Sequence, residues 1–264
     1  MLEIRNIHKT FNAGTVNEKQ ALRGVSLTLA DGDFVTVIGG NGAGKSTLLN
    51  AVAGVWPVDE GSIVVGGADV THLPEFKRAQ YIGRVFQDPM MGTAATMQIE
   101  ENLALAMRRG KSRSLRVGIT KQEREEYKEL LKILDLGLED RLTSKVGLLS
   151  GGQRQALTLL MATLQKPKLL LLDEHTAALD PKTAAKVLAL SDRIVEENGL
   201  TTMMVTHNMK DAIVHGNRLI MMYDGRIVID VSGEEKKKLT VPDLLALFSK
   251  VSGSDEADDK LLLS

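Results

Sequence analysis

The stretch "VTVIGGNGAGKSTLLN", Val35 to Asn50, decides the fold class. An apolar run enters a glycine loop, as a buried strand does before a turn, and helical spacing follows the loop. The loop fits the pattern G-x-x-x-x-G-K-[ST], in which backbone amides and a helix N-terminus surround phosphates. Lys45 is placed to reach the β- and γ-phosphates, and the Ser46 hydroxyl is placed for Mg²⁺. A glycine turn beside a surface lysine is the alternative, but the flanking strand and helix favour a nucleotide-binding α/β domain.

A second stretch, "LLLLDEHTAALDP" from Leu169 to Pro181, supplies carboxylates. The leucines predict a buried parallel strand that ends at the carboxyl edge of the sheet, where ligands bind in such folds. Asp173 is then placed to hold Mg²⁺ through water, and Glu174 to polarise an attacking water. Taken alone, the same letters describe equally well a strand that ends in two solvated acids. Combined with the glycine loop, they predict an NTPase.

A third motif, "LSGGQ", opens a helix at Ser150. Ser150 is a suitable N-cap, and the glycines expose amide donors at the helix start, which would give a second anion site. Along the helix, an apolar face is expected from Leu157, Leu160, Met161 and Leu164.

Composition sets the limits of the other possibilities. The chain has 264 residues, 43% of them hydrophobic and 25% charged, which suits one large globular domain. A net charge of −1 gives no reason to expect a nucleic-acid partner, and the lack of cysteine excludes disulfides and thiolate metal sites. The start "MLEIRNIHKTF" lacks the apolar core of a secretory signal, and no apolar run approaches the roughly 18 to 20 residues of a membrane span. We therefore expect a cytosolic protein.

The remaining patterns predict an α/β core with additions. "MLEIRNI" and "ALRGVSLTL" indicate antiparallel strands around the polar loop "NAGTVNEKQ". A helical pattern predicts an inserted helical subdomain at about residues 88–166. "TTMMVTH" is a buried strand that ends in His207, and the last strands turn at Asp224 and Gly225. We expect an NTPase domain over residues 1–230, then a lysine run, a short helix and a frayed acidic tail over residues 231–264.

In order and spacing, these motifs resemble the ATP-binding cassette (ABC) family, the nucleotide-binding subunits of ABC transporters. The resemblance implies a P-loop NTPase core with an antiparallel β subdomain and an inserted α-helical subdomain, which binds ATP and Mg²⁺ and hydrolyses ATP. It implies that Phe11 stacks on adenine, that Gln87 contacts Mg²⁺ and a membrane partner, and that His207 lies at the γ-phosphate. The implied catalytic residues are Glu174, His207 and Gln87; the ATP contacts are Phe11, Gly39, Asn41, Gly42, Ala43, Gly44, Lys45, Ser46, Thr47, Ser150, Gly151, Gly152, Gln153 and Asp180; the metal ligands are Ser46, Gln87 and Asp173.

The resemblance also implies partners. In the family, the "LSGGQ" motif, called the signature, of one subunit closes on ATP held by the phosphate loop of another. A chain with one phosphate loop and one signature is therefore expected to form a head-to-tail homodimer around two ATP molecules. The chain would sit peripherally on the cytoplasmic face of the membrane, bound to separate permease subunits. The helical insertion and "DPMMGTAATMQIEENL", which follows Gln87, resemble the docking surface.

Departures from the commonest family pattern narrow the group. The chain reads "GGQRQALTLLMATL" where many members read "GGQRQRVAIARAL", and it has His175 where many have proline. With "FQDPMMGT", these features resemble the ATPases of bacterial importers that use a binding lipoprotein of the tryptophan/tyrosine type. That resemblance implies a substrate-binding lipoprotein partner and uptake of a small solute, with an amino acid as the candidate cargo. For His175 we favour a loop-shaping or interface role, because His207 already supplies a catalytic histidine.

Other interpretations stay open. "HKTFNAGTVNEKQALRGVSL" also resembles cassettes that serve export or lipoprotein release. A role in translation is disfavoured by the single cassette. In cluster assembly, the lack of cysteine excludes direct thiolate ligation but leaves a scaffold role open. A sensor without turnover is disfavoured by the presence of Glu174 and His207. For the basic stretch "RRGKSRSLR" we favour a solvated loop over a surface for lipid headgroups or acidic partners.

Overall fold

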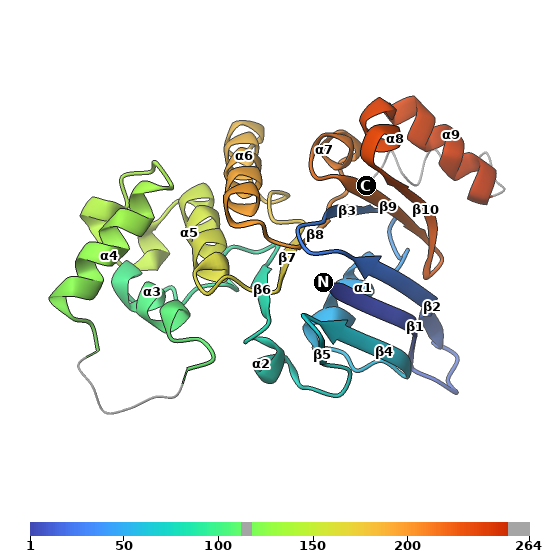
Figure 1. Ribbon diagram of the computed structural model, residues 1–264, viewed down its shortest axis with the longest axis horizontal. Helices are drawn as coiled ribbons and strands as arrows, with labels where there is room; N and C mark the ends of the chain where they lie inside the picture. Colours follow the sequence, from blue (N-terminus) through green and yellow to red (C-terminus); the bar gives the residue numbers. More distant parts are fainter. Residues whose placement is uncertain (112–117, 253–264) are drawn as a thin grey trace.

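The computed structural model describes residues 1–111 and 118–252, so most of the basic stretch and the acidic tail lie outside the described residues (Figure 1). The strands are β1 (Leu2–Phe11), β2 (Lys19–Leu29), β3 (Phe34–Ile38), β4 (Glu60–Val65), β5 (Ala68–Asp69), β6 (Ile82–Val85), β7 (Leu169–Asp173), β8 (Thr202–Val205), β9 (Arg218–Tyr223) and β10 (Arg226–Ser232). The α-helices are α1 (Lys45–Ala53), α2 (Glu75–Arg78), α3 (Ile99–Met107), α4 (Lys121–Lys132), α5 (Gly151–Thr163), α6 (Pro181–Asn198), α7 (Met209–Val214), α8 (Gly233–Lys238) and α9 (Val241–Ser252).

The central sheet has the order β10-β9-β3-β8-β7-β6. All neighbouring pairs in it are parallel except β9 and β10, which form an antiparallel hairpin. Both faces are covered, which explains why β3, β7 and β8 are continuous apolar runs. Leu172 pairs with Met204 and Val37 with Val205, so these three strands end together. Their carboxyl ends place the glycine loop, the Asp-Glu pair and His207 at one edge, and the α/β fold expected from the sequence is confirmed.

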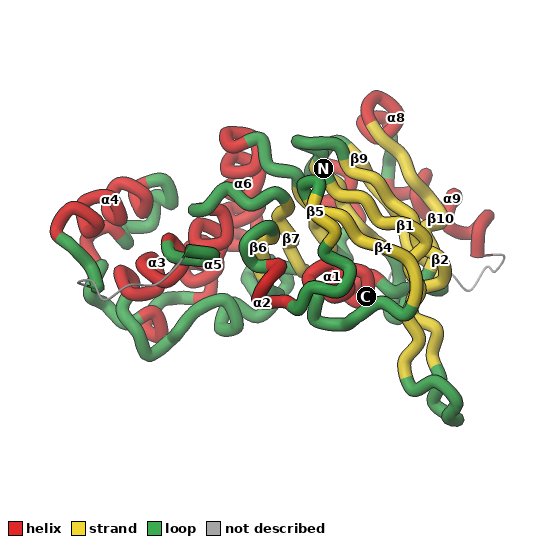
Figure 2. Tube along the Cα trace, turned by 60° about the horizontal axis from the view of Figure 1, so that its bottom comes forward, coloured by secondary structure: helices red, strands yellow, loops and turns green. Residues whose placement is uncertain are grey.

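A second, antiparallel sheet has the order β2-β1-β4-β5 and packs over α1 and the central sheet (Figure 1). Its β1–β2 hairpin is longer than predicted, because Phe11 pairs with Lys19 inside the segment expected to be loop. Register shifts along β1 bend this hairpin, and its end projects from the sheet (Figure 2).

Helices α3, α4 and α5 lie between β6 and β7 in the chain and form a helical end beside α6 (Figure 1). A separate hydrophobic core joins these helices to the other face of β6, β7 and β8. Of the predicted apolar face of α5, Leu157 and Leu160 are buried, whereas Met161 and Leu164 are only partly buried. The helix is buried over more of its circumference than predicted, because Gln155 and Thr158 are also buried.

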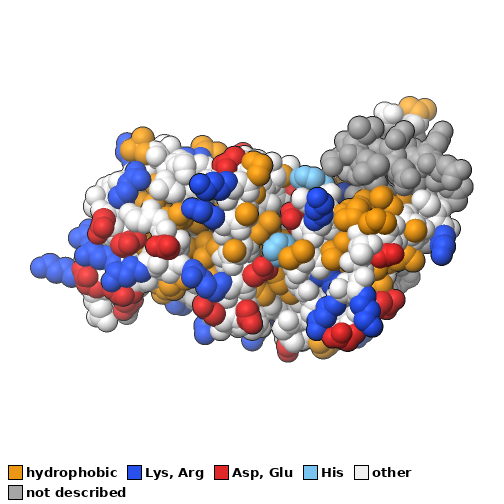
Figure 3. All heavy atoms as spheres, turned by 90° about the horizontal axis from the view of Figure 1, so that it is seen from above, with side chains coloured by type: hydrophobic (Ala, Val, Ile, Leu, Met, Phe, Trp, Pro, Cys, Tyr) orange, Lys and Arg blue, Asp and Glu red, His pale blue; other side chains and the backbone are white. Residues whose placement is uncertain are grey.

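The chain beyond β10 folds back on α7 and the β9–β10 hairpin, with Leu244 and Phe248 of α9 in a third core. The lysine run, for which the sequence analysis made no structural prediction, forms the end of α8. Within it Lys236 is buried and donates hydrogen bonds to the carbonyls of His215 and Gly216, where α7 ends. Among the described residues, no helix is both long and apolar enough to cross a bilayer. On the face shown in Figure 3, acidic and basic side chains are interspersed over the helical end.

Candidate nucleotide site

The loop from Gly39 to Thr47 is held tightly by its neighbours. Gly39 has φ +146°, and a Cβ there would lie 2.2 Å from the Met222 carbonyl oxygen. Gly44 has φ +103°, and a Cβ there would lie 2.6 Å from the Ala21 carbonyl oxygen. Helix α1 starts after Gly44 without a side-chain cap, so its first amides are available to an anion. Within the loop, Ala43 and Lys45 are buried and Asn41, Gly42 and Ser46 are exposed.

Lys45 lies inside this loop and is only 7% exposed. Its ammonium donates to the carbonyls of Gly39, at 2.6 Å, and Gly40, at 3.3 Å. Burial lowers the pKa of Lys45, and the nearby carboxylate of Glu174 opposes that shift. Lys45 and Glu174 are therefore close enough to interact electrostatically at this edge of the sheet.

Glu174 and His207 are brought together by adjacent strands. The Nδ1 atom of His207 lies 3.7 Å from a carboxylate oxygen of Glu174. Glu174 has φ +42°, a left-handed conformation that is uncommon for a non-glycine residue and costs about 1–3 kcal/mol. Its amide donates to the carbonyl of Val205, which fixes the residue to the end of β8. This strained backbone directs the second carboxylate away from the strand and toward the histidine.

Asp173 ends β7 and is bound by a residue that the sequence did not single out. The Nη2 atom of Arg84 lies 3.1 Å from an oxygen of Asp173 and 2.8 Å from the side-chain oxygen of Asn50. Gln87 and Asp173 line the same cavity, of about 670 Å³. Carboxylate, amide and hydroxyl oxygens are the ligands that Mg²⁺ takes, so Asp173, Gln87 and Ser46 fit a magnesium site in chemistry.

The signature lies on a different surface from the phosphate loop. Ser150 caps α5, its hydroxyl accepting from the Gln153 amide at 3.3 Å and its own amide donating to the Gln153 side chain at 3.1 Å. Gly152 packs against α6 so closely that a Cβ would lie 2.2 Å from Cγ2 of Thr183, while Gly151 is exposed. Ser150, Gly152 and Gln153 line a cavity of about 740 Å³ whose other walls come from α6 and the segment after α4.

Asp180 and Phe11 have structural partners of their own. Asp180 caps α6 by accepting from the Thr183 amide at 3.1 Å, and hydrogen bonding from the Thr183 side chain and then from this amide lowers the pKa of the Asp180 carboxyl. The ring of Phe11 makes an edge-to-face contact with Trp56, with ring centroids 4.9 Å apart. Lys19, which pairs with Phe11, brings its ammonium to 3.3 Å from where a Cβ of Gly42 would be. The hairpin end thus lies over the phosphate loop.

His175 is buried, with 2% of its surface exposed. Its Nε2 atom lies 3.0 Å from the hydroxyl of Ser191, which donates to the Val187 carbonyl at 2.9 Å. The hydroxyl therefore accepts from the imidazole. Burial, with a smaller effect of His215, lowers the pKa of His175 to about 4. A neutral, enclosed imidazole fits the loop-shaping role expected from the sequence and leaves it out of reach of another chain.

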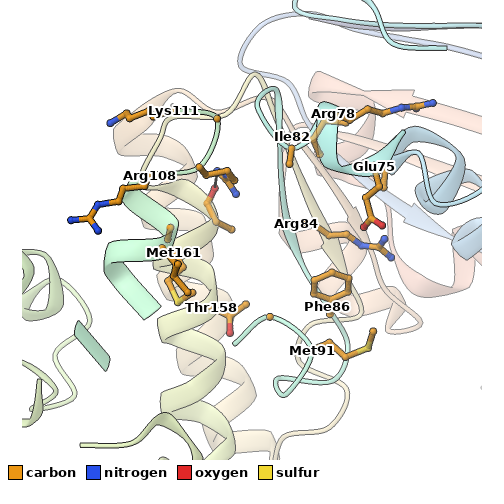
Figure 4. Close-up of a pocket in the computed structure, with 18 residues that line it drawn as sticks. Glu75, Arg78, Ile82, Arg84, Phe86, Met91, Arg108, Lys111, Thr158 and Met161 are labelled. Carbon is orange, nitrogen blue, oxygen red and sulfur yellow. Dashed lines mark hydrogen bonds between the residues drawn. The ribbon is translucent and has the colours of Figure 1, made fainter. Parts of the chain in front are cut away.

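A groove opens between the nucleotide core and the helical end (Figure 4). Its volume is about 490 Å³, and Phe86, Met91 and Met161 give it apolar walls. Met91 is 67% exposed. Basic residues stand around it, namely Arg108, Arg109 and Lys111. Such an exposed apolar groove is typical of a protein-binding site.

Sequence patterns missed Arg84 and Lys19. A charged residue within the apolar strand "YIGRVFQ" was a signal for Arg84, because a buried guanidinium in a parallel strand needs a partner. Lys19 had no such signal, since it stands in a stretch of polar residues.

The comparisons with known proteins identify the class. Residues 22–177 match the family model described as ABC transporter. The chain is 46% identical over 248 residues to the tyrosine transport ATP-binding protein of Clostridioides difficile, covering 94% of this chain and 98% of that protein. It is 36% identical over 230 residues to the aliphatic sulfonates import ATP-binding protein of Albidiferax ferrireducens, covering 87% of this chain and 73% of that one. A solved dimeric ATP-binding cassette with bound ADP and phosphate is similar, with a TM-score of 0.74 and 31% identity over 88% of this chain and 98% of that one.

The chain therefore belongs to the ABC transporter family, as its ATP-binding subunit, and it is an ATPase. The resemblance drawn from the motifs is confirmed, including the likeness to the tyrosine-type importer group. The roles of individual residues remain predictions.

Proposed function

We propose that this ATPase, as a homodimer with two ATP molecules between its subunits, drives uptake of a small solute, with an aromatic amino acid such as tyrosine as the first candidate. The observation that carries the proposal is the 46% identity, over nearly the full length of both chains, to a protein named for tyrosine transport.

The chemistry follows from the sheet edge. Glu174 accepts a proton from water as the water oxygen attacks the γ-phosphorus, and the bond to the bridging oxygen breaks to leave ADP. His207, 3.7 Å from that carboxylate, holds Glu174 and the phosphate in place, and Lys45 neutralises the phosphate charge. Asp173, Gln87 and Ser46 would hold Mg²⁺, which supplies charge neutralisation to the phosphates when bound. Residues 1–230 form the catalytic domain in this proposal, with about 88–166 as its helical insertion.

The proposed partners bind two surfaces outside the phosphate loop, namely the signature surface and the groove. Ser150 and the glycines after it lie on a surface other than that of the phosphate loop, which supports closure of a second copy on the ATP. The groove beside Phe86 and Met91 supports docking of a permease subunit, which would hold the chain at the cytoplasmic face of the membrane. A substrate-binding lipoprotein would complete the complex on the opposite side of the membrane.

Uptake measurements test the proposal. Cells that carry Glu174→Gln in place of the native gene are expected to lose uptake of labelled tyrosine, because dimer closure is no longer followed by hydrolysis. Glu197→Gln is the matched control, since Glu197 is exposed on α6, and it should leave uptake at the native rate. Undiminished tyrosine uptake in the Glu174→Gln cells would refute tyrosine as cargo. Loss of lipoprotein release instead would support the export interpretation.

A further inference from the structure

Arg84 connects the groove with the carboxylate assigned to the metal. The residue lies in β6, in register with Leu171 of β7, and its side chain is 12% exposed. Its guanidinium lies over the ring of Phe86, 4.6 Å from the ring centroid, and this stacking helps to fix the position of the Arg84 side chain. Arg84 lines both the groove and the cavity that contains Gln87 and Asp173 (Figure 4).

The guanidinium satisfies Asp173 at one oxygen. The ion pair is 3.1 Å long, the Asp173 side chain is 16% exposed, and Asn50 on α1 accepts from the same Nη2 atom. The Nε atom of Arg84 is buried and has no hydrogen-bond partner among the described residues, so its side-chain hydrogen bonds are those of Nη2 to Asp173 and Asn50. Glu75 of α2 lines both cavities with Arg84, whereas Asp173 lines only the second.

We propose that Arg84 is a positioning residue that competes with the divalent cation for Asp173, and so sets how strongly metal binding is coupled to ATP binding. The proposal rests on the proposed role of Asp173 at the metal. A positive charge this close to a metal carboxylate repels the cation, and in the metal-free protein it neutralises a carboxylate that would otherwise repel ATP. Both effects weaken the dependence of ATP affinity on metal.

The experiment measures ATP affinity without turnover, in the Glu174→Gln background, once in EDTA and once with saturating Mg²⁺. The dissociation constant of ATP in EDTA, divided by that in Mg²⁺, reports how strongly the metal strengthens ATP binding. Any effect of Arg84 on ATP affinity that is the same with and without metal cancels in this ratio. Arg84→Gln is expected to increase the ratio roughly tenfold, because it removes the positive charge beside Asp173. Glutamine is chosen because its amide can still donate a hydrogen bond. Arg84→Lys keeps the charge and should stay near the parent value.

Asp173→Asn separates the proposal from its premise. If Asp173 holds the metal, this change alone collapses the ratio, and adding Arg84→Gln to it then has no further effect. An unchanged ratio in Asp173→Asn would refute the role of Asp173. A collapsed ratio in Asp173→Asn, together with an unchanged or smaller ratio in Arg84→Gln, would overturn the competition while leaving the metal site in place.

Discussion

At the scale of single residues, His175 shows how a buried polar group shapes a catalytic loop. It directly follows the strained Glu174, and its hydrogen bond to Ser191 ties the segment between β7 and α6 to the interior of α6. The bond requires a proton on Nε2, because the Ser191 hydroxyl already donates to Val187, and burial keeps the imidazole neutral.

We predict that His175 makes the protein less stable in acid. Its pKa is about 4 in the folded chain and about 6.5 when unfolded, so the unfolded state binds the proton first as pH falls. The contribution of neutral His175 to the free energy of unfolding is complete above pH 6.5 and is lost progressively toward pH 4. The loss amounts to about 2 kcal/mol between pH 7.5 and pH 5. Urea unfolding should therefore show a smaller loss of stability between these two pH values in His175→Gln than in the native chain.

The control for this prediction is His72→Gln, because His72 is exposed and its replacement should leave the native pH dependence intact. Equal pH dependence in His175→Gln and the native chain would mean that His175 is not held neutral. The loop-shaping role further predicts ATP turnover within about threefold of native at pH 7.5 for a folded His175→Gln. A folded variant without turnover would give His175 a chemical role instead.

At this scale the sequence predicted where the candidate residues lie wherever a motif has fixed spacing. Lys45, Asp173, Glu174 and His207 fall at one sheet edge because parallel strands end together. Arg84 could not be assigned to Asp173, because that contact joins residues 89 positions apart and depends on which strands are neighbours.

At the scale of elements, the apolar strands β3, β7 and β8 were predictable, whereas the polar end of the β1–β2 hairpin and helix α8 were not. The end of the β1–β2 hairpin is held by cross-strand pairing of polar residues, and α8 by the buried Lys236, so neither shows hydrophobic periodicity. The close approach of α5 to α6 likewise depends on Gly152, and in the sequence this glycine is noticeable only as part of the signature.

Gly152→Ala is expected to destabilise the fold by about 1–3 kcal/mol, because the added Cβ would lie 2.2 Å from Cγ2 of Thr183 and push α5 away from α6. Thr183→Ser removes that methyl group, so it should restore most of the lost stability when combined with Gly152→Ala. The comparison is made by thermal unfolding of the single and double variants.

Gly151→Ala is the matched control for this contact. A Cβ at Gly151 would lie 3.3 Å from the end of the flexible Leu179 side chain, so its stability should stay within about 0.5 kcal/mol of native. If Gly152→Ala were as stable as Gly151→Ala, close packing would not explain the second glycine.

At the scale of the whole molecule, the phosphate loop and the signature lie on different surfaces, and our proposal makes them two halves of one nucleotide site. The phosphate loop, Glu174 and His207 are at the edge of the central sheet, whereas Ser150 opens α5 on the helical end (Figure 1). A cassette of similar fold was solved as a dimer after hydrolysis. The sequence could predict that two halves exist, but their separation depends on how α5 and α6 pack on the sheet.

The most direct test of the head-to-tail dimer is the molar mass of Glu174→Gln in solution, measured by light scattering with ATP and with ADP. One chain has a mass of 28.7 kDa. We predict about twice that mass with ATP, the mass of one chain with ADP, and the mass of one chain with ATP when Ser150→Arg is added to block the signature. Glu174→Gln that stays at the mass of one chain in saturating ATP, or a dimer that Ser150→Arg leaves intact, would contradict the shared site.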